Sequence, residues 1–147
     1  MTGHEQVVEV ETRIDAPPDV VFEYFTDSEM YVRWMGLGAD LDLRVDGEYT
    51  LSMPGGHKAM GRYLVVDPPH RLTFTWGWEG NSDLLPGSTT VEITLVPDGD
   101  ATIVRLRHSG LPTDELRQLH GQGWTRYLGR LRIASLGGDP GPDDGST

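Results

Sequence analysis

Apolar and polar side chains alternate in one segment after another between residues 6 and 108, and this pattern constrains the fold more than any other feature. In the most apolar of these segments, Leu72, Phe74, Trp76 and Trp78 all fall on the same side of the alternation. A period of two is typical of a β-strand with one buried face and one exposed face. The chain must therefore fold around a sheet with one strongly apolar face.

Turn signals separate these segments and set the number of strands. Asp46-Gly47 favours a tight hairpin, because both central positions of such a turn need positive φ. We expect two short helices after the first strand, where Pro17 and Pro18 open one and Gly36 ends the other. The predicted strands span residues 6–14, 41–45, 48–53, 58–66, 71–79, 90–95 and 102–108.

A long amphipathic helix is predicted after the last strand. Thr113 or Asp114 can accept hydrogen bonds from the amides of its first turn. Apolar side chains then recur at helical spacing from Leu116 to Leu131. This apolar stripe can cover the apolar face of the sheet.

The fold class that follows is α+β, a helix-grip fold. We expect a curved antiparallel sheet of about six to seven strands around a long C-terminal helix, with two short helices after the first strand. Where the sheet curves more than the helix can fill, an apolar pocket remains between them. Gly121, Gly123 and Gly129 lie inside the long helix, and we interpret them as marks of a bend or of close packing against the sheet.

Charge and cysteine content exclude several classes of function. The chain has no cysteine, so disulfides, thiolate metal sites and cysteine nucleophiles are excluded. Its 23 Asp and Glu outweigh 12 Lys and Arg, and the net charge of -11 would repel phosphate backbones and anionic lipid surfaces. We therefore expect no nucleic-acid partner and no membrane partner. The polar first residues favour a cytoplasmic protein.

The end of the chain differs in composition from the rest. Residues 137–145 contain no apolar side chain beyond glycine and proline, so they cannot bury enough surface to offset their ordering entropy. We expect a single domain over residues 1–136 and a disordered acidic tail over residues 137–147.

A group of mostly aromatic residues is predicted to line the pocket. Tryptophan and tyrosine present flat apolar surfaces on which a ligand can stack, and two indoles on one strand face are hard to pack tightly. The same residues could equally form an ordinary core. The candidate ligand-binding residues are Trp34, Tyr49, Met60, Arg62, Trp76, Trp78, His108, His120, Trp124 and Tyr127.

The polar candidates have more than one interpretation. His108 and His120 can approach each other across the pocket, either as an acid-base pair or as two hydrogen-bonded core histidines. No two histidines show the helical i, i+4 spacing of a zinc site, and Ser52, Ser82, Ser109 and Thr75 lack the elbow motif that a hydrolase triad would show. We expect no metal, no cofactor and no committed catalytic residue.

The chain resembles the SRPBCC or START-like superfamily, also called birch-pollen-allergen-like, and within it the homologues of the activator of the Hsp90 ATPase. The motifs that carry this resemblance are Ala16-Pro17-Pro18-Asp19-Val20-Val21-Phe22, Arg33-Trp34-Met35-Gly36, Asp67-Pro68-Pro69-His70-Arg71-Leu72, Thr90-Val91-Glu92-Ile93-Thr94-Leu95, Arg105-Leu106-Arg107-His108-Ser109-Gly110-Leu111 and His120-Gly121-Gln122-Gly123-Trp124. The resemblance implies a helix-grip fold with a hydrophobic ligand cavity.

The resemblance leaves three functions open, because such folds include ligand carriers, polyketide cyclases and chaperone-stimulating modules. Our first hypothesis is the binding of a small apolar or aromatic, lipid- or polyketide-like ligand without catalysis. The alternatives are a cyclase or dehydratase that uses His108, His120 or Arg62, and a module that activates a chaperone ATPase in a stress response. We expect a monomer or a homodimer.

Overall fold

The computed structural model describes residues 7–145. Within them, seven strands form one antiparallel sheet in the order β1-β7-β6-β5-β4-β3-β2. The strands are β1 (Val8–Ile14), β2 (Gly38–Leu41), β3 (Glu48–Ser52), β4 (Lys58–Asp67), β5 (Arg71–Trp78), β6 (Thr89–Asp98) and β7 (Ala101–Ser109); the helices are α1 (Pro18–Thr26), α2 (Ser28–Tyr31), the 3-10 turn η2 (Pro54–Gly56) and α3 (Asp114–Ser135). The predicted α+β helix-grip fold is confirmed.

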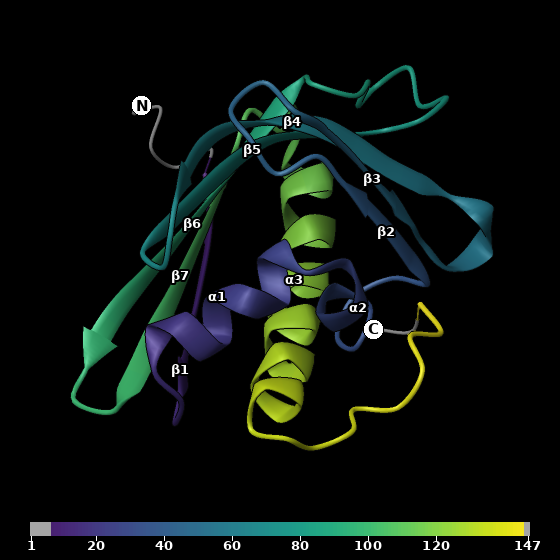
Figure 1. The fold of residues 1–147 in the computed structure, drawn as a ribbon. Coiled ribbons are helices and arrows are strands. Elements are labelled where there is room, and N and C mark those ends of the chain that lie inside the picture. The colour runs from purple at the N-terminus through teal and green to yellow at the C-terminus, as the bar shows by residue number, and fades with distance from the viewer. Residues whose placement is uncertain (1–6, 146–147) are drawn as a thin grey trace.

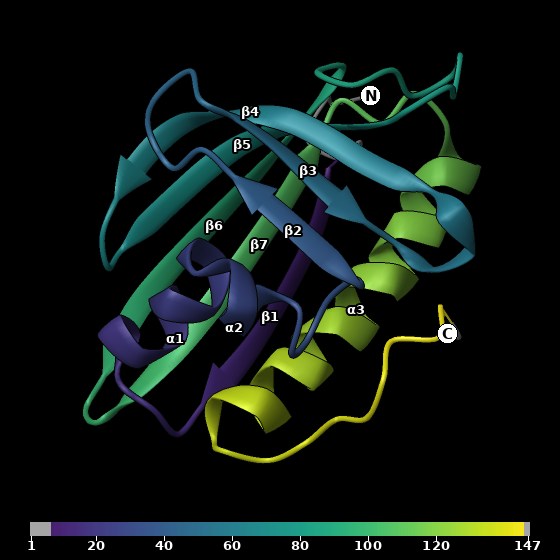
Figure 2. The same ribbon diagram turned by 45° about the vertical axis from the view of Figure 1, so that its right-hand side comes forward.

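The helix α3 runs along the concave side of the curved sheet (Figures 1 and 2). Thr113 caps it, since its side chain accepts a hydrogen bond from the Leu116 amide at 3.1 Å. The short helix α1 lies beside α3 (Figure 1) and also contacts β6 and β7, and α2 packs against α1. They close one end of the space between sheet and helix.

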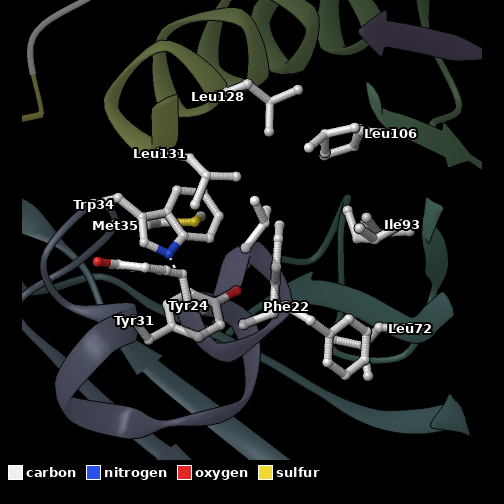
Figure 3. Packing of buried hydrophobic residues seen from close by; sticks show 14 of the residues in the cluster. Phe22, Tyr24, Tyr31, Trp34, Met35, Leu72, Ile93, Leu106, Leu128 and Leu131 are labelled. Atoms are coloured by element: carbon white, nitrogen blue, oxygen red, sulfur yellow. Dashed lines mark hydrogen bonds between the residues drawn. The ribbon is translucent and has the colours of Figure 1, made fainter. Parts of the chain in front are cut away.

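The main core fills this closed end. In Figure 3, Trp34, Met35 and the rings from α1 and α2 face Leu128 and Leu131 of α3, and the strand residues Leu72, Ile93 and Leu106 lie opposite. Strict alternation in β6 puts every second side chain into this core. Each fully buried side chain of this size contributes about 1.5–3 kcal/mol. The closed end therefore supplies most of the hydrophobic stabilisation.

The connection before β3 differs from the prediction. We expected a strand over 41–45 and a two-residue hairpin, but β2 ends at Leu41. The Asp46 amide donates to the Tyr63 carbonyl at 2.8 Å, and the Tyr63 amide donates to the Gly47 carbonyl at 2.9 Å. The Gly47 amide also donates to the Arg44 carbonyl at 2.8 Å, so a tight turn over residues 44–47 is present and its backbone pairs with β4. The connection between β2 and β3 therefore spans six residues, 42–47.

The glycines of α3 do not all mark a bend or close packing against the sheet. The helix runs without interruption across Gly121, Gly123 and Gly129. A Cβ added at Gly123 or Gly129 would meet no heavy atom within 4 Å, and one at Gly121 would meet Val8 at an ordinary 3.6 Å. The prediction of a bend or of close packing is therefore wrong at Gly123 and Gly129, where the helix faces open space.

The segment 137–145 has no helix or strand, and it turns back alongside α3 (Figure 2). The buried guanidinium of Arg130 donates to the Pro140 carbonyl at 3.1 Å, to the Gly141 carbonyl at 2.8 Å and to the Trp34 carbonyl at 2.8 Å. One side chain of α3 thus joins this segment to the main core.

Asp143 makes the reciprocal contact from the segment to the domain. Its buried carboxylate accepts hydrogen bonds from the Gly36 amide at 2.8 Å, the Tyr127 hydroxyl at 2.7 Å and Arg126 at 3.2 Å. Burial favours a higher pKa, but these hydrogen bonds outweigh it and hold the pKa of Asp143 below its ordinary value. Composition suggested a disordered tail because it counts apolar burial only. Residues 146–147 of that predicted tail lie outside the described part of the chain.

We predict that Arg130→Met lowers the free energy of unfolding by about 2–4 kcal/mol, because the buried carbonyl of Trp34 and the part-buried carbonyls of Pro140 and Gly141 lose their donor. Urea denaturation followed by circular dichroism measures the change. Arg132→Met is the matched control on the same helix, since Arg132 is exposed, and it should change stability by less than about 0.5 kcal/mol. Equal stability of the two variants would contradict the contacts assigned to Arg130.

Candidate functional site

A cavity of about 660 Å³ lies at the end of the fold away from the short helices. It is bounded by the last residues of β5, the loop 79–84, the turn around η2 and the first half of α3. Its lining residues are Met35, Met53, His57, Trp76, Trp78, Glu79, Gly80, Asn81, Ser82, Leu84, Leu116, Leu119, His120, Gly123, Trp124 and Tyr127. This is the space that the helix leaves unfilled on the concave face.

Three tryptophans from two elements meet on one wall. The alternation of β5 places Trp76 and Trp78 on the concave face, with ring centroids 5.4 Å apart and planes at 85°. Trp124 comes from α3, and its ring lies 5.1 Å from that of Trp76. Edge-to-face contacts of this kind favour a rigid aromatic surface over a collapsed one.

The loop after β5 folds back over Gly77 to form the cavity rim. The Trp78 amide donates to the Leu84 carbonyl at 2.7 Å, and Leu84 is buried. A Cβ at Gly77 would lie only 2.0 Å from the Leu85 carbonyl oxygen. Glycine at this position therefore permits the close approach that places Leu84 at the cavity.

Trp124 is held by a chain of hydrogen bonds behind the wall. Its Nε1 donates to His108 Nδ1 at 3.0 Å, so this nitrogen of the imidazole must be unprotonated. His108 Nε2 lies 2.9 Å from Thr89 Oγ1, which itself donates to the Trp76 carbonyl at 2.8 Å. His108 is therefore the neutral Nε2–H tautomer.

Trp78 is held by a second histidine in the mirror arrangement. Its Nε1 donates to His120 Nε2 at 3.3 Å. His120 Nδ1 lies 2.9 Å from the Leu116 carbonyl, which can only accept. His120 is therefore the neutral Nδ1–H tautomer, and its free lone pair is already shared with an indole.

Burial and geometry both keep these imidazoles uncharged. Burial lowers the pKa of His108 to about 3, with a further contribution from His120, whose ring centroid is 5.3 Å away. Burial also lowers the pKa of His120, although its hydrogen bond to the Leu116 carbonyl acts in the opposite direction. A proton on the accepting nitrogen of either ring would face an indole N–H. The tryptophan wall is thus neutral at physiological pH.

Five of the ten candidate residues line the cavity: Trp76, Trp78, His120, Trp124 and Tyr127. His108 lies directly behind Trp124 and does not reach the lining. The predicted approach of His108 to His120 is observed, with both rings hydrogen-bonded; His108 is buried, whereas His120 is half-buried at the cavity.

Two aromatic candidates lie in the core instead. Trp34 is stacked on Tyr31, with ring centroids 5.2 Å apart, and its Nε1 donates to the Tyr24 carbonyl at 2.8 Å. Tyr49 is buried and donates from its hydroxyl to the Thr75 carbonyl at 2.6 Å. Both rings pack against the protein itself, so neither is among the cavity residues.

The side chains of Met60 and Arg62 on β4 point away from the cavity, whereas we predicted that they line it. Ala59 and Tyr63 are the buried residues of this strand, so the side chains between them face outward. Arg62 is half exposed and pairs with Glu48 at 3.4 Å. The pairing of β4 with β3 places the odd-numbered residues from Ala59 to Tyr63 on the concave face of the sheet. Neither Met60 nor Arg62 therefore lines the cavity.

Sequence reasoning missed the cavity's other walls. Leu116, Leu119 and Gly123 belong to the helical stripe that the sequence did show, but nothing marked them as lining rather than core. Met53 and His57 flank η2, and the loop 79–82 carried only a turn signal. Among the lining residues of the described chain, Glu79 is the one with a carboxyl group, and none is a lysine or an arginine.

The middle of the chain matches a known family. Residues 15–135 match the model described as Activator of Hsp90 ATPase homolog 1-like protein. The chain belongs to this family. The resemblance stated from the sequence motifs is therefore confirmed.

Solved structures of similar proteins extend this family comparison. The AHSA1-like protein from Rhizobium etli is 42% identical, with 96% of this chain and 88% of that chain covered and a TM-score of 0.75. CalU16 from Micromonospora echinospora is 32% identical, with 88% and 75% covered and a TM-score of 0.73. DynU16, a putative protein in the dynemicin biosynthetic locus, is 27% identical, with 95% and 50% covered and a TM-score of 0.81.

None of the curated proteins compared with this AHSA1-like chain matches it.

Within residues 7–145, none of the helices combines the length and the apolar character that crossing a membrane requires.

We predict that His108 makes the domain sensitive to mild acid. Its pKa is lower in the folded chain than the ordinary 6.5, so the unfolded chain binds the proton first as the pH falls. The stability that neutral His108 contributes is complete above pH 6.5 and is lost toward pH 3. Between pH 7 and pH 5 this loss is about 2 kcal/mol.

Urea denaturation of the His108→Gln variant at both pH values tests this. Between pH 7 and pH 5, the free energy of unfolding of the variant should fall by less than that of the unmodified chain. His120, whose pKa is also lowered, should cause the remaining fall. His70→Gln is the control, because His70 is exposed, and it should keep the full pH dependence. An unchanged pH dependence in His108→Gln would exclude this role.

Proposed function

We propose that this protein binds a small hydrophobic or aromatic ligand, lipid- or polyketide-like in character, in the cavity between the sheet and α3. The observation that carries this proposal is the 660 Å³ cavity with a wall of three tryptophans. A rigid aromatic wall binds flat apolar molecules at little entropic cost, because its side chains are already ordered. The cavity also has the size of ordinary small-molecule sites.

The polar groups near the cavity favour binding without catalysis. A general acid or base must exchange a proton with the substrate near neutral pH. His108 and His120 already have both nitrogens in hydrogen bonds, and burial lowers the pKa of each. The half-buried Tyr127 of the wall donates from its hydroxyl to Asp143. These groups serve to hold the wall in place.

We predict that Gly123→Leu abolishes ligand binding without unfolding the protein. Gly123 lines the cavity on α3, and an added side chain meets open space, so the leucine would occupy the ligand's place. Replacing a helical glycine also favours the helix by about 0.5–1 kcal/mol. Displacement of an uncharged fluorescent probe such as N-phenyl-1-naphthylamine measures binding, and thermal denaturation measures stability.

Gly129→Leu is the matched control for this experiment. Gly129 lies on the same helix, is equally free of neighbours and is exposed away from the cavity. It should gain similar helix stability and keep full probe binding. If both glycine variants bind the probe as well as the unmodified chain, the cavity is not the binding site.

A cyclase or dehydratase is the alternative that His120 favours, since it lines the cavity and its hydrogen bond from Trp78 is long at 3.3 Å. Breaking that bond would free His120 Nε2 to accept a proton from a substrate. His120→Gln should then reduce turnover of a polyketide-like substrate by at least about a hundredfold. Retained turnover, with the fold intact by circular dichroism, would exclude this role.

Activation of a chaperone ATPase is the candidate that the family description favours. A protein contact would use the outer surface, and the net charge of -11 would suit a basic patch on the partner. The two glycine variants separate the candidates. Stimulation of an ATPase would survive Gly123→Leu, whereas ligand binding would not.

A further inference from the structure

The carboxylate of Asp143 joins the segment 137–145 to two parts of the fold. Its side chain is fully buried and accepts hydrogen bonds from the Gly36 amide at 2.8 Å, the Tyr127 hydroxyl at 2.7 Å and Arg126 at 3.2 Å. Gly36 lies between α2 and β2, whereas Arg126 and Tyr127 belong to α3. One side chain of the segment therefore connects the long helix to the connection that precedes β2.

Tyr127 brings this contact to the cavity, because it is a lining residue. Its ring lies edge-on to Trp34 with centroids 6.5 Å apart, and the guanidinium carbon of Arg126 lies 4.9 Å from its centroid. Its hydroxyl end is held by the hydrogen bond to Asp143. The place of this ring at the cavity therefore depends on whether Asp143 is docked.

A second part of the lining also rests against the segment. Met35 and Met53 line the cavity, and a Cβ added at the intervening Gly36 would lie 3.3 Å from the Met53 sulfur. A Cβ added at Gly145 would lie 3.2 Å from Pro54, the residue after Met53. The segment thus backs the cavity wall at α3, at the connection before β2 and at the turn η2.

The segment docks with little apolar contact of its own. Residues 137–145 contain no apolar side chain beyond glycine and proline, and their three aspartates add negative charge to a chain with a net charge of -11. Repulsion of this kind opposes docking. The match to the family model ends at residue 135, so the segment lies outside the matched domain. A modest gain in contact energy at the wall can therefore shift the balance between docked and undocked segment.

We propose that docking of the segment 137–145 and ligand binding favour each other, with the hydrogen bond between Asp143 and Tyr127 as the link. This inference rests on the proposed function and adds regulation of the same site. A ligand in the cavity packs against the Tyr127 ring that the docked segment holds. By thermodynamic reciprocity, a ligand that prefers the assembled wall stabilises the docked segment by the same factor. Asp143 is then a positioning residue that acts through Tyr127.

Asp143→Asn tests this coupling, because it keeps the size of the side chain but places an amide N–H group among hydrogen-bond donors. The dissociation constant of N-phenyl-1-naphthylamine, measured by its fluorescence, should rise about tenfold as the wall loses its preorganisation. Asp139→Asn is the matched control. It makes the same charge change in the same segment at an exposed position, and asparagine can still accept from the Gly141 amide. It should change the dissociation constant by less than about twofold.

A double-mutant cycle separates positioning through Tyr127 from a general loss of structure. Tyr127→Phe removes the hydroxyl, so in this background Asp143→Asn should raise the dissociation constant by less than about twofold. The coupling is wrong if Asp143→Asn has its full effect in both backgrounds, has none in the unmodified chain, or is matched by Asp139→Asn. If the unmodified chain does not bind the probe, the proposed function itself fails.

Hydrogen exchange of the unmodified chain gives a second test that needs no variant. The Gly36 amide donates to Asp143, so its exchange reports docking of the segment. The neighbouring Leu37 amide donates to the Ser52 carbonyl at 2.7 Å and reports the sheet instead. Saturation with the probe should slow exchange at Gly36 about tenfold and at Leu37 by less than about twofold. Equal slowing at both amides, or none at Gly36, would overturn the proposal even though the probe binds.

Discussion

The structure depends on a mismatch between one wide apolar sheet face and one helix that cannot cover all of it. At the closed end, side chains of α1, α2 and the second half of α3 fill the concave face completely. At the other end, α3 presents Gly123 where a large side chain would be needed to reach the sheet. Protein interiors pack densely wherever side chains allow, so a void of this size reflects missing bulk on the helix.

The polar network behind the tryptophans follows from this mismatch. Trp124 is buried, and Trp78 is half-buried beside the cavity. The hydrogen bonds from Trp124 to His108 and from Trp78 to His120 fix both rings in addition to this packing. They require neutral imidazoles, and burial supplies that condition by lowering both pKa values. The same bonds that order the wall therefore occupy the lone pairs that acid-base catalysis would need.

The sequence predicted the sheet, the long helix and the family, because these depend on periodicity along one element. It failed where the outcome depends on pairing between elements. In β4 both faces are partly apolar, so only the pairing with β3 and the irregularity between Tyr63 and Val65 decide that Met60 faces outward. Trp34 and Trp76 look alike in sequence, and only the presence or absence of a facing side chain separates core from cavity wall. Similarly, no local composition reveals that Arg130 would hold the segment 137–145.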